Sequence, residues 1–161
     1  MKIQTSLLAL AAAILSTSLW AGPGHHGDDA HEHAAAHASP AGTPGSEQHV
    51  SRIIKVDALD SMSFKHEPIT VKAGETIQFD ITNHGVLVHE FAIGVTEEHK
   101  EHQIMMQQMP NMQHDDPNVV TLQAGETKSL LWTFAKAADI EVACNIPGHY
   151  EGGMHSPVQV N

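Results

Sequence analysis

Short stretches in which hydrophobic and polar residues alternate recur along the chain from Val50 onward. They are rich in Val, Ile, Thr and Phe and are separated by turn residues such as Gly, Asn and Pro. Alternation with a period of two predicts strands. The expected strands are Val50–Val56, Ile69–Val71, Glu75–Thr82, Val86–Gly94, Val119–Leu122, Thr127–Phe134, Glu141–Cys144 and Val158–Val160. So many short strands in one stretch predict an all-β antiparallel sandwich.

Two stretches depart from this alternation. Glu97–Gln108 is polar, lacks Gly and Pro and carries helix-forming residues, so it predicts one short helix within the sandwich. Residues 22–48 are rich in Gly, Ala, Pro, His and acids and offer little to bury. This composition predicts a disordered, His-rich tail. The expected folded domain therefore covers residues 49–161.

The first 21 residues have the pattern of an export signal. Lys2 is followed by the apolar run Leu7–Leu15 and then by small residues up to Ala21, after which we expect cleavage, with Ser18 as the alternative position. The apolar run is too short for a permanent transmembrane anchor. Arg52 is the only arginine, so no twin-arginine export signal is present. We therefore expect a soluble monomer in the periplasm, loaded with its metal after export.

Charge narrows the range of partners. The formal net charge is −11 with histidine neutral, and it becomes −12 without residues 1–21, which hold one lysine and no acid. A strongly negative protein disfavours nucleic acid and anionic membrane surfaces, and favours cations or a basic redox partner. The sequence contains no evident catalytic triad, phosphate-binding loop or paired-carboxylate arrangement, so we do not expect an enzyme.

The segment CNIPGHYEGGM carries the most specific chemistry. It places Cys144, the only cysteine, five residues before His149 and ten before Met154. Cysteine, two histidines and a weak axial methionine form the ligand set of blue-copper sites. A short loop can bring these three residues around one ion, whereas spacings of five would scatter them around a helix.

The second imidazole must come from elsewhere in the chain. His89 in GVLVHEFAI is the first candidate, because alternation places Leu87, His89 and Phe91 on one face of an apolar strand. A histidine among core residues needs a polar partner. That partner is either a metal ion or a backbone carbonyl. His84, in the turn Asn83-His84-Gly85, is the competing candidate.

These residues belong to a longer resemblance. Residues 50–161 resemble the cupredoxins, the small blue copper proteins of the plastocyanin and azurin kind. The resemblance is carried by AGETIQFDITN, HEFAIG, the PN before Val119, AGETKSLLWTF and AC-x-IPGHYEGGM. It is closest to exported, His- and Met-rich cupredoxins associated with copper tolerance.

The resemblance implies a Greek-key sandwich with one short helix in a long Met- and His-rich insertion. It also implies His89, Cys144 and His149 as in-plane ligands of one type 1 copper, with Met154 as the axial ligand. Two residues depart from the family pattern. Glu90 stands where an Asn or Ser is common, and His155 stands where many members have a small or apolar residue; we expect His155 to point away from the metal.

Two further groups of soft or borderline ligands lie outside this motif. Imidazole and thioether groups bind copper, and the thioether prefers Cu(I). The expected accessory copper ligands are His102, Met105, Met106, Met109, Met112 and His114, and the expected weak site in the tail consists of His25, His26, His31, His33 and His37. The alternatives are a core-facing methionine stripe on the helix and a simple solvated extension.

Three functions are compatible with these features. The first is copper tolerance, in which the protein binds copper in the periplasm, cycles its oxidation state or passes it to a copper-transfer protein. The second is a soluble one-electron carrier between redox partners, and the third is a cupredoxin subunit that serves a larger oxidase. The additional His and Met segments favour the first, because a simple electron carrier needs only four ligands.

Overall fold

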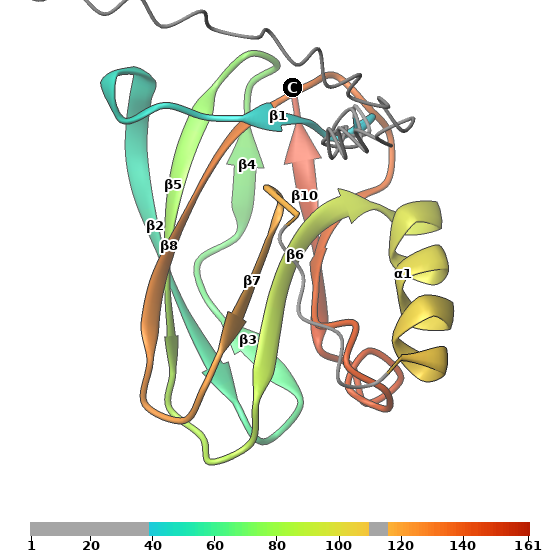
Figure 1. The fold of residues 1–161 in the computed structure, drawn as a ribbon. Coiled ribbons are helices and arrows are strands. Elements are labelled where there is room, and N and C mark those ends of the chain that lie inside the picture. Colours follow the sequence, from blue (N-terminus) through green and yellow to red (C-terminus); the bar gives the residue numbers. More distant parts are fainter. Residues whose placement is uncertain (1–38, 110–115) are drawn as a thin grey trace, which may run out of the picture. The chain divides into compact units, whose positions relative to one another are not determined.

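The computed structural model describes residues 39–109 and 116–161, which form two five-stranded sheets, one α-helix and a short 3-10 helix at Glu47–His49 (Figure 1). The first sheet has the order β1 (Gly42–Pro44), β8 (Thr127–Phe134), β5 (Thr76–Asn83), β2 (Val50–Leu59) and β3 (Ser63–Lys65). The second has the order β4 (Ile69–Val71), β10 (His155–Val160), β9 (Ile140–Ala143), β6 (His89–Val95) and β7 (Val119–Leu122). The all-β Greek-key sandwich expected from the sequence is confirmed.

The alternation suggested purely antiparallel sheets, but both sheets are mixed. β2 pairs with β5 in parallel, and β10 pairs with β4 in parallel, whereas the other pairs are antiparallel. Parallel neighbours require a crossover connection. Between β2 and β5 the chain supplies it by way of β3 and then β4, which lies in the opposite sheet.

Aromatic side chains join the two sheets in the core. In β5, Ile77, Phe79 and Ile81 alternate with more exposed residues and are fully buried. The ring of Phe79 lies 5.3 Å from that of Phe91 in the opposite sheet, and 6.2 Å from that of Phe134. The inward face of each sheet is therefore the face that alternation assigned to the core.

The folded part begins earlier than the composition predicted, because β1 lies inside the expected disordered tail 22–48. β1 pairs with β8, and Ala41 just before it is fully buried. Trp132 Nε1 donates a hydrogen bond to Ala41 O at 3.2 Å. The prediction of disorder is therefore wrong for residues 42–44: so short a strand has no periodicity of its own and owes its order to β8. Residues 1–38, including the expected export signal, lie outside the described part.

Strand boundaries also differ at the segment before β6. The expected strand began at Val86, but β6 begins at His89, and Val86 and Leu87 are exposed. The carboxylate of Asp60 accepts hydrogen bonds from the N–H groups of Val86, at 2.9 Å, and Leu87, at 3.3 Å. A side chain thus takes backbone donors that a strand would need. Elsewhere β3 was not expected, β2 continues to Leu59, and β10 begins at His155.

The helix α1 (Thr96–Gln108) agrees with the prediction to within one residue. The side chain of Glu98 accepts a hydrogen bond from Val95 N–H at 2.8 Å and so satisfies a donor at its start. The helix packs beside β6 and β9 (Figure 1), and only His99 and Met106 of its residues are buried. A Cβ at Gly94 would meet Glu98 Oε2 at 3.1 Å, so glycine allows this close packing.

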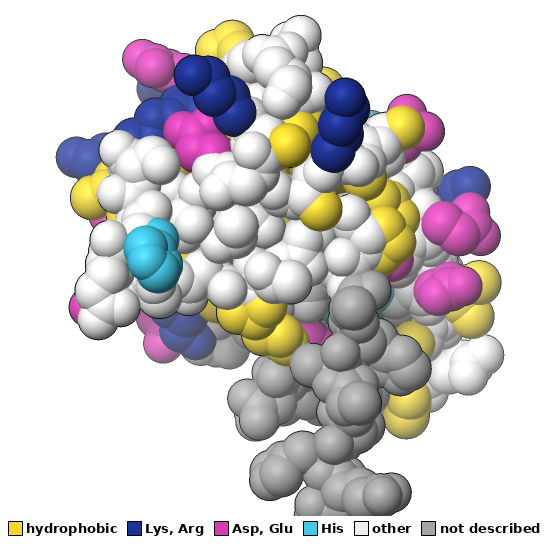
Figure 2. Space-filling model, turned by 90° about the horizontal axis from the view of Figure 1, so that it is seen from above, with side chains coloured by type: hydrophobic (Ala, Val, Ile, Leu, Met, Phe, Trp, Pro, Cys, Tyr) yellow, Lys and Arg dark blue, Asp and Glu magenta, His cyan; other side chains and the backbone are white. Residues whose placement is uncertain are grey.

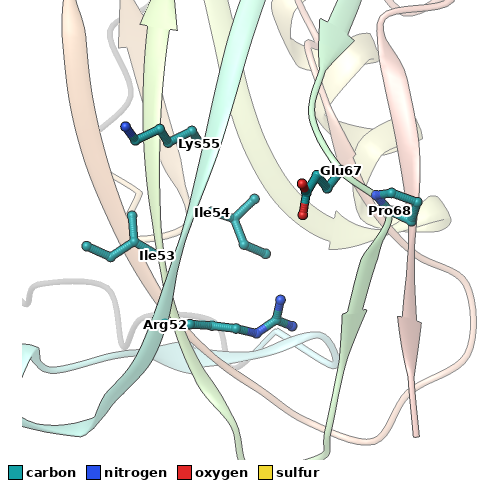
Figure 3. A pocket seen from close by; sticks show the side chains of 6 residues that line it. All are labelled: Arg52, Ile53, Ile54, Lys55, Glu67 and Pro68. Atoms are coloured by element: carbon teal, nitrogen blue, oxygen red, sulfur yellow. The ribbon is translucent and has the colours of Figure 1, made fainter.

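A pocket of about 330 Å³ lies where β2 faces the segment before β4 (Figure 3). Arg52 and Ile54 point toward Glu67 and Pro68, while Lys55 points to the other side of β2. No sulfur ligand lines this pocket.

Figure 2 shows the end of the molecule opposite the one at which β6 begins. On this surface, hydrophobic side chains are scattered among polar ones. Within the described ranges, no helix is long and apolar enough to cross a membrane.

Candidate metal centre

The loop after β9 closes on itself through main-chain hydrogen bonds. Cys144 N–H donates to Met154 O at 3.0 Å, and Met154 N–H donates to His149 O at 3.0 Å. Gly148 adopts φ +87°, a conformation that glycine takes without a steric penalty, and so reverses the chain just before His149. This local folding brings the Cys, His and Met of the motif to the same end of the sandwich.

β6 adds a histidine to this loop. One ligand atom each from His89, Cys144 and His149 lies within 4.8 Å of the others, the only such group found in residues 39–109 and 116–161. Cys144 Sγ is 3.4 Å from His149 Nδ1, and the two imidazole rings are 5.2 Å apart. His89, Cys144 and Met154 are fully buried, whereas His149 is half-buried.

The hydrogen bonding of His89 leaves one nitrogen for a metal. Its Nε2 lies 3.1 Å from Asp60 Oδ1, so Nε2 carries the proton and donates it. Its Nδ1 is buried and has no hydrogen-bond partner among the described residues. A histidine that binds a metal commonly donates its other N–H to a carboxylate. The N–H of Val86 first, and then the contact with His89, hold the pKa of Asp60 below its usual value, so this carboxylate stays ionised.

The electrostatics of the other two residues favour uncharged forms in the absence of metal. Burial raises the pKa of the Cys144 thiol to about 12, although the N–H groups of Glu90, at 3.3 Å, and Ile146 act in the opposite direction. Burial, and then the proximity of His89, lowers the pKa of His149. A metal ion that displaces the thiol proton would supply the positive charge that compensates the buried thiolate. One thiolate and two imidazoles suit a soft or borderline ion such as copper.

Two asparagines beside the site were not predicted from the sequence, although their hydrogen bonds hold the backbone and side chains around it. Asn83 is fully buried, and its Nδ2 donates to Leu87 O at 2.8 Å and Leu122 O at 3.2 Å. Asn145 Nδ2 donates to Glu90 Oε1 at 3.1 Å and to His99 Nδ1 at 3.2 Å. Asn83 closes the AGETIQFDITN motif and Asn145 follows Cys144, but only the fold shows their partners. Asp60, the partner of His89, carried no signal in the sequence.

Two histidines near the centre have other partners. His84 is half-exposed, and its Nε2 is 3.0 Å from Asp57 Oδ1. It is not part of the three-residue group. His155 stacks on Tyr150 with ring centroids 4.3 Å apart, and its Nδ1 lies 3.5 Å from Glu141 Oε2.

The expected accessory ligands are divided by the structure. Met106 is buried against the sheet, and His102 is largely buried, 3.6 Å from a carboxylate oxygen of Glu90. Met105 is half-buried and Met109 is exposed. Met112 and His114, and the tail histidines His25, His26, His31, His33 and His37, lie outside the described residues.

The chain is similar in sequence to known copper-binding proteins. The family model of copper binding proteins, plastocyanin/azurin family, matches residues 50–161. The copper-resistant cuproprotein CopI of Rubrivivax gelatinosus is 40% identical over 161 residues, which cover 99% of this chain and 98% of that protein. The copper-resistant cuproprotein CopI of Pseudomonas aeruginosa is 40% identical over 155 residues, covering 75% of this chain and 85% of that protein.

Solved structures are similar in fold. Auracyanin B superposes with a TM-score of 0.61 at 20% identity, covering 77% of this chain and 99% of auracyanin B. The azurin Az-iso2 of Methylomonas sp. strain J superposes with a TM-score of 0.53 at 16% identity, covering 70% of this chain and 99% of the azurin. At these identities the similarity establishes the arrangement of the sheets and nothing about partners.

Proposed function

Because the chain belongs to the plastocyanin/azurin family of copper-binding proteins, we propose that His89, Cys144, His149 and Met154 hold one type 1 copper ion and that the protein acts in copper tolerance. The main evidence for the metal site is the buried Nδ1 of His89, which lacks a hydrogen-bond partner among the described residues. His89 forms a possible metal-binding group with Cys144 and His149. An orphaned buried nitrogen is costly unless a ligand uses its lone pair.

Neighbouring residues form hydrogen bonds with two of these ligands. Asp60 fixes the orientation and tautomer of His89, and the N–H of Glu90 donates to the sulfur of Cys144. A bound copper ion would supply one-electron redox chemistry between Cu(I) and Cu(II). Fixed ligands let both oxidation states share one arrangement of side chains. Half-buried His149 is the ligand nearest to solvent.

The tolerance role is supported by relatives and by composition. Two relatives at 40% identity are named copper-resistant cuproproteins, and one of them aligns over almost the whole chain. In α1, His102 lies 3.6 Å from a carboxylate oxygen of Glu90, the residue after His89, and the same helix carries Met105 and Met106 as further copper-binding groups. The export pattern of residues 1–21 supports a periplasmic location for this activity. There the protein would bind copper, cycle its oxidation state and pass it on.

One observation favours electron carriage as the second candidate. Val86, Leu87 and Val88 are exposed apolar residues directly before His89, with Val86 80% exposed. An apolar surface next to a redox centre suits a transient protein partner. Such a carrier would need no further copper-binding residues.

Deletion of the gene distinguishes the two functions. The strain is grown on a series of copper concentrations, and respiratory flux is measured beside growth at ordinary copper. For tolerance, the highest tolerated copper concentration falls while respiration is unchanged. Complementation with a Cys144→Ala variant should fail to restore tolerance. A respiratory defect with normal tolerance would instead support electron carriage.

A further inference from the structure

A polar cluster lies on the other side of β6 from the metal centre, under α1. Alternation along β6 turns His89 toward the core and Glu90 toward the helix, where its side chain is only 1% exposed. Asn145 Nδ2 donates to Glu90 Oε1, and His102 Nε2 approaches the other carboxylate oxygen, Oε2. A buried carboxylate is stable only when a positive charge or hydrogen bonds compensate it.

The spacing of Glu90 and His102 suits a shared metal ion. Glu90 Oε2 and His102 Nε2 are 3.6 Å apart, which is long for a hydrogen bond. Nitrogen and carboxylate donors each about 2.0–2.2 Å from one ion are separated by this distance when the angle at the ion is roughly 120°. Both side chains are at least largely buried, at 1% and 13% exposure, so little rearrangement is needed to enclose an ion.

A thioether lies on the same face of the helix as His102. Met106 follows His102 by one helical turn on the same face of α1 and is 5% exposed. Carboxylate and imidazole donors bind Cu(II), and imidazole and thioether donors bind Cu(I). We propose that Glu90, His102 and Met106 form a second copper site, in addition to the centre at Cys144; this inference rests on the proposed copper-binding function.

Glu90 and Asn145 connect the two sites. Its main-chain N–H donates to Cys144 Sγ at 3.3 Å, while its side chain accepts from Asn145, the residue after Cys144. A cation at the second site withdraws charge from the carboxylate that orients Asn145. The metal centre therefore senses the second ion through Glu90, whose N–H contacts Cys144 Sγ, and through Asn145, which follows Cys144 in the chain.

The test is a copper titration of the complete protein after export, with Cu(II) and separately with Cu(I) under a competing chelator. The wild type should bind at least two equivalents, and the second should shift the visible absorption of the first. His102→Gln should lose the additional equivalent of both Cu(II) and Cu(I) and abolish that shift. Glu90→Gln, which retains hydrogen-bonding capacity toward Asn145, should lose the additional equivalent of Cu(II), and Met106→Leu should lose the additional equivalent of Cu(I).

Matched controls are His84→Gln and Glu97→Gln, whose side chains are exposed or half-exposed. They should bind as much copper as the wild type. Circular dichroism checks that each variant is folded. A wild type that binds a single equivalent, or variants that bind as many as the wild type, overturns the second site. Loss of the visible band in the wild type itself would instead contradict the first site, so the two failures are distinct.

Discussion

His89 Nε2 lies 3.1 Å from Asp60 Oδ1, while the second nitrogen of the same ring is buried without a hydrogen-bond partner among the described residues. The same carboxylate also accepts hydrogen bonds from the N–H groups of Val86 and Leu87. Asp60 therefore holds both the ring and the loop that leads to it. One side chain outside the ligand set fixes the direction in which His89 offers its lone pair.

Replacement of Asp60 by Asn should weaken copper binding. Loss of a carboxylate behind a metal-binding histidine commonly costs about 10–100-fold in affinity, because the ring loses its fixed tautomer and part of its basicity. Competition with a copper chelator measures this change. Asp57→Asn is the control, since Asp57 contacts exposed His84 instead. Equal affinities for both variants would show that Asp60 does not orient the ligand.

The Cu(II) protein should be intensely blue, because a short copper–thiolate bond gives strong visible charge transfer. Cys144→Ala should remove this colour while the far-ultraviolet circular dichroism of the metal-free protein is retained. The substitution removes one buried sulfur from a loop that main-chain hydrogen bonds also close. A colourless Cu(II) complex of the wild type would contradict a type 1 site.

The decrease in stability of the metal-free protein at low pH should depend on His99. Burial lowers the pKa of His99, which donates from Nε2 to Glu141 O and accepts at Nδ1 from Asn145. The unfolded chain therefore binds a proton near pH 6.5 that the folded chain refuses until lower pH. Stability is complete above this value and falls with decreasing pH, by at most about 1.4 kcal/mol per pH unit from this residue.

His99→Gln should make that decrease shallower between pH 6.5 and the lowered folded pKa. Urea unfolding at a series of pH values measures it, with His84→Gln as the control because its ring is half-exposed. Parallel curves for wild type and His99→Gln would show that His99 does not titrate differently on unfolding.

Asn83 should contribute strongly to stability. It is fully buried, its Nδ2 donates to Leu87 O and Leu122 O, and its Oδ1 accepts from Gly85 N–H at 2.8 Å. Asn83→Ala leaves these backbone groups unsatisfied and should cost about 2–3 kcal/mol. Thr82→Ala removes an exposed hydroxyl contact and should cost less than about 1 kcal/mol. Urea midpoints at constant pH compare the two, and similar losses would contradict the role of Asn83.

The sequence determined the features that depend on neighbours along the chain. Alternation identified most strands, and composition identified the helix 97–108 to within one residue. The spacing of Cys144, His149 and Met154 sufficed to predict that a single loop brings them together, because the hydrogen bonds that close it lie within that loop. His89 was found because a polar residue in an apolar strand calls for a partner.

Only the tertiary structure decided what depends on distant segments. β1 is ordered because β8 pairs with it, and the parallel pairs arise from crossovers that alternation cannot report. Alternation places Glu90 on the face of the strand opposite His89, and only the packing of α1 makes it a buried carboxylate beside His102. The partner of His89 is Asp60, 29 residues away. Periodicity reveals which face a side chain occupies, whereas packing alone decides what lies opposite that face.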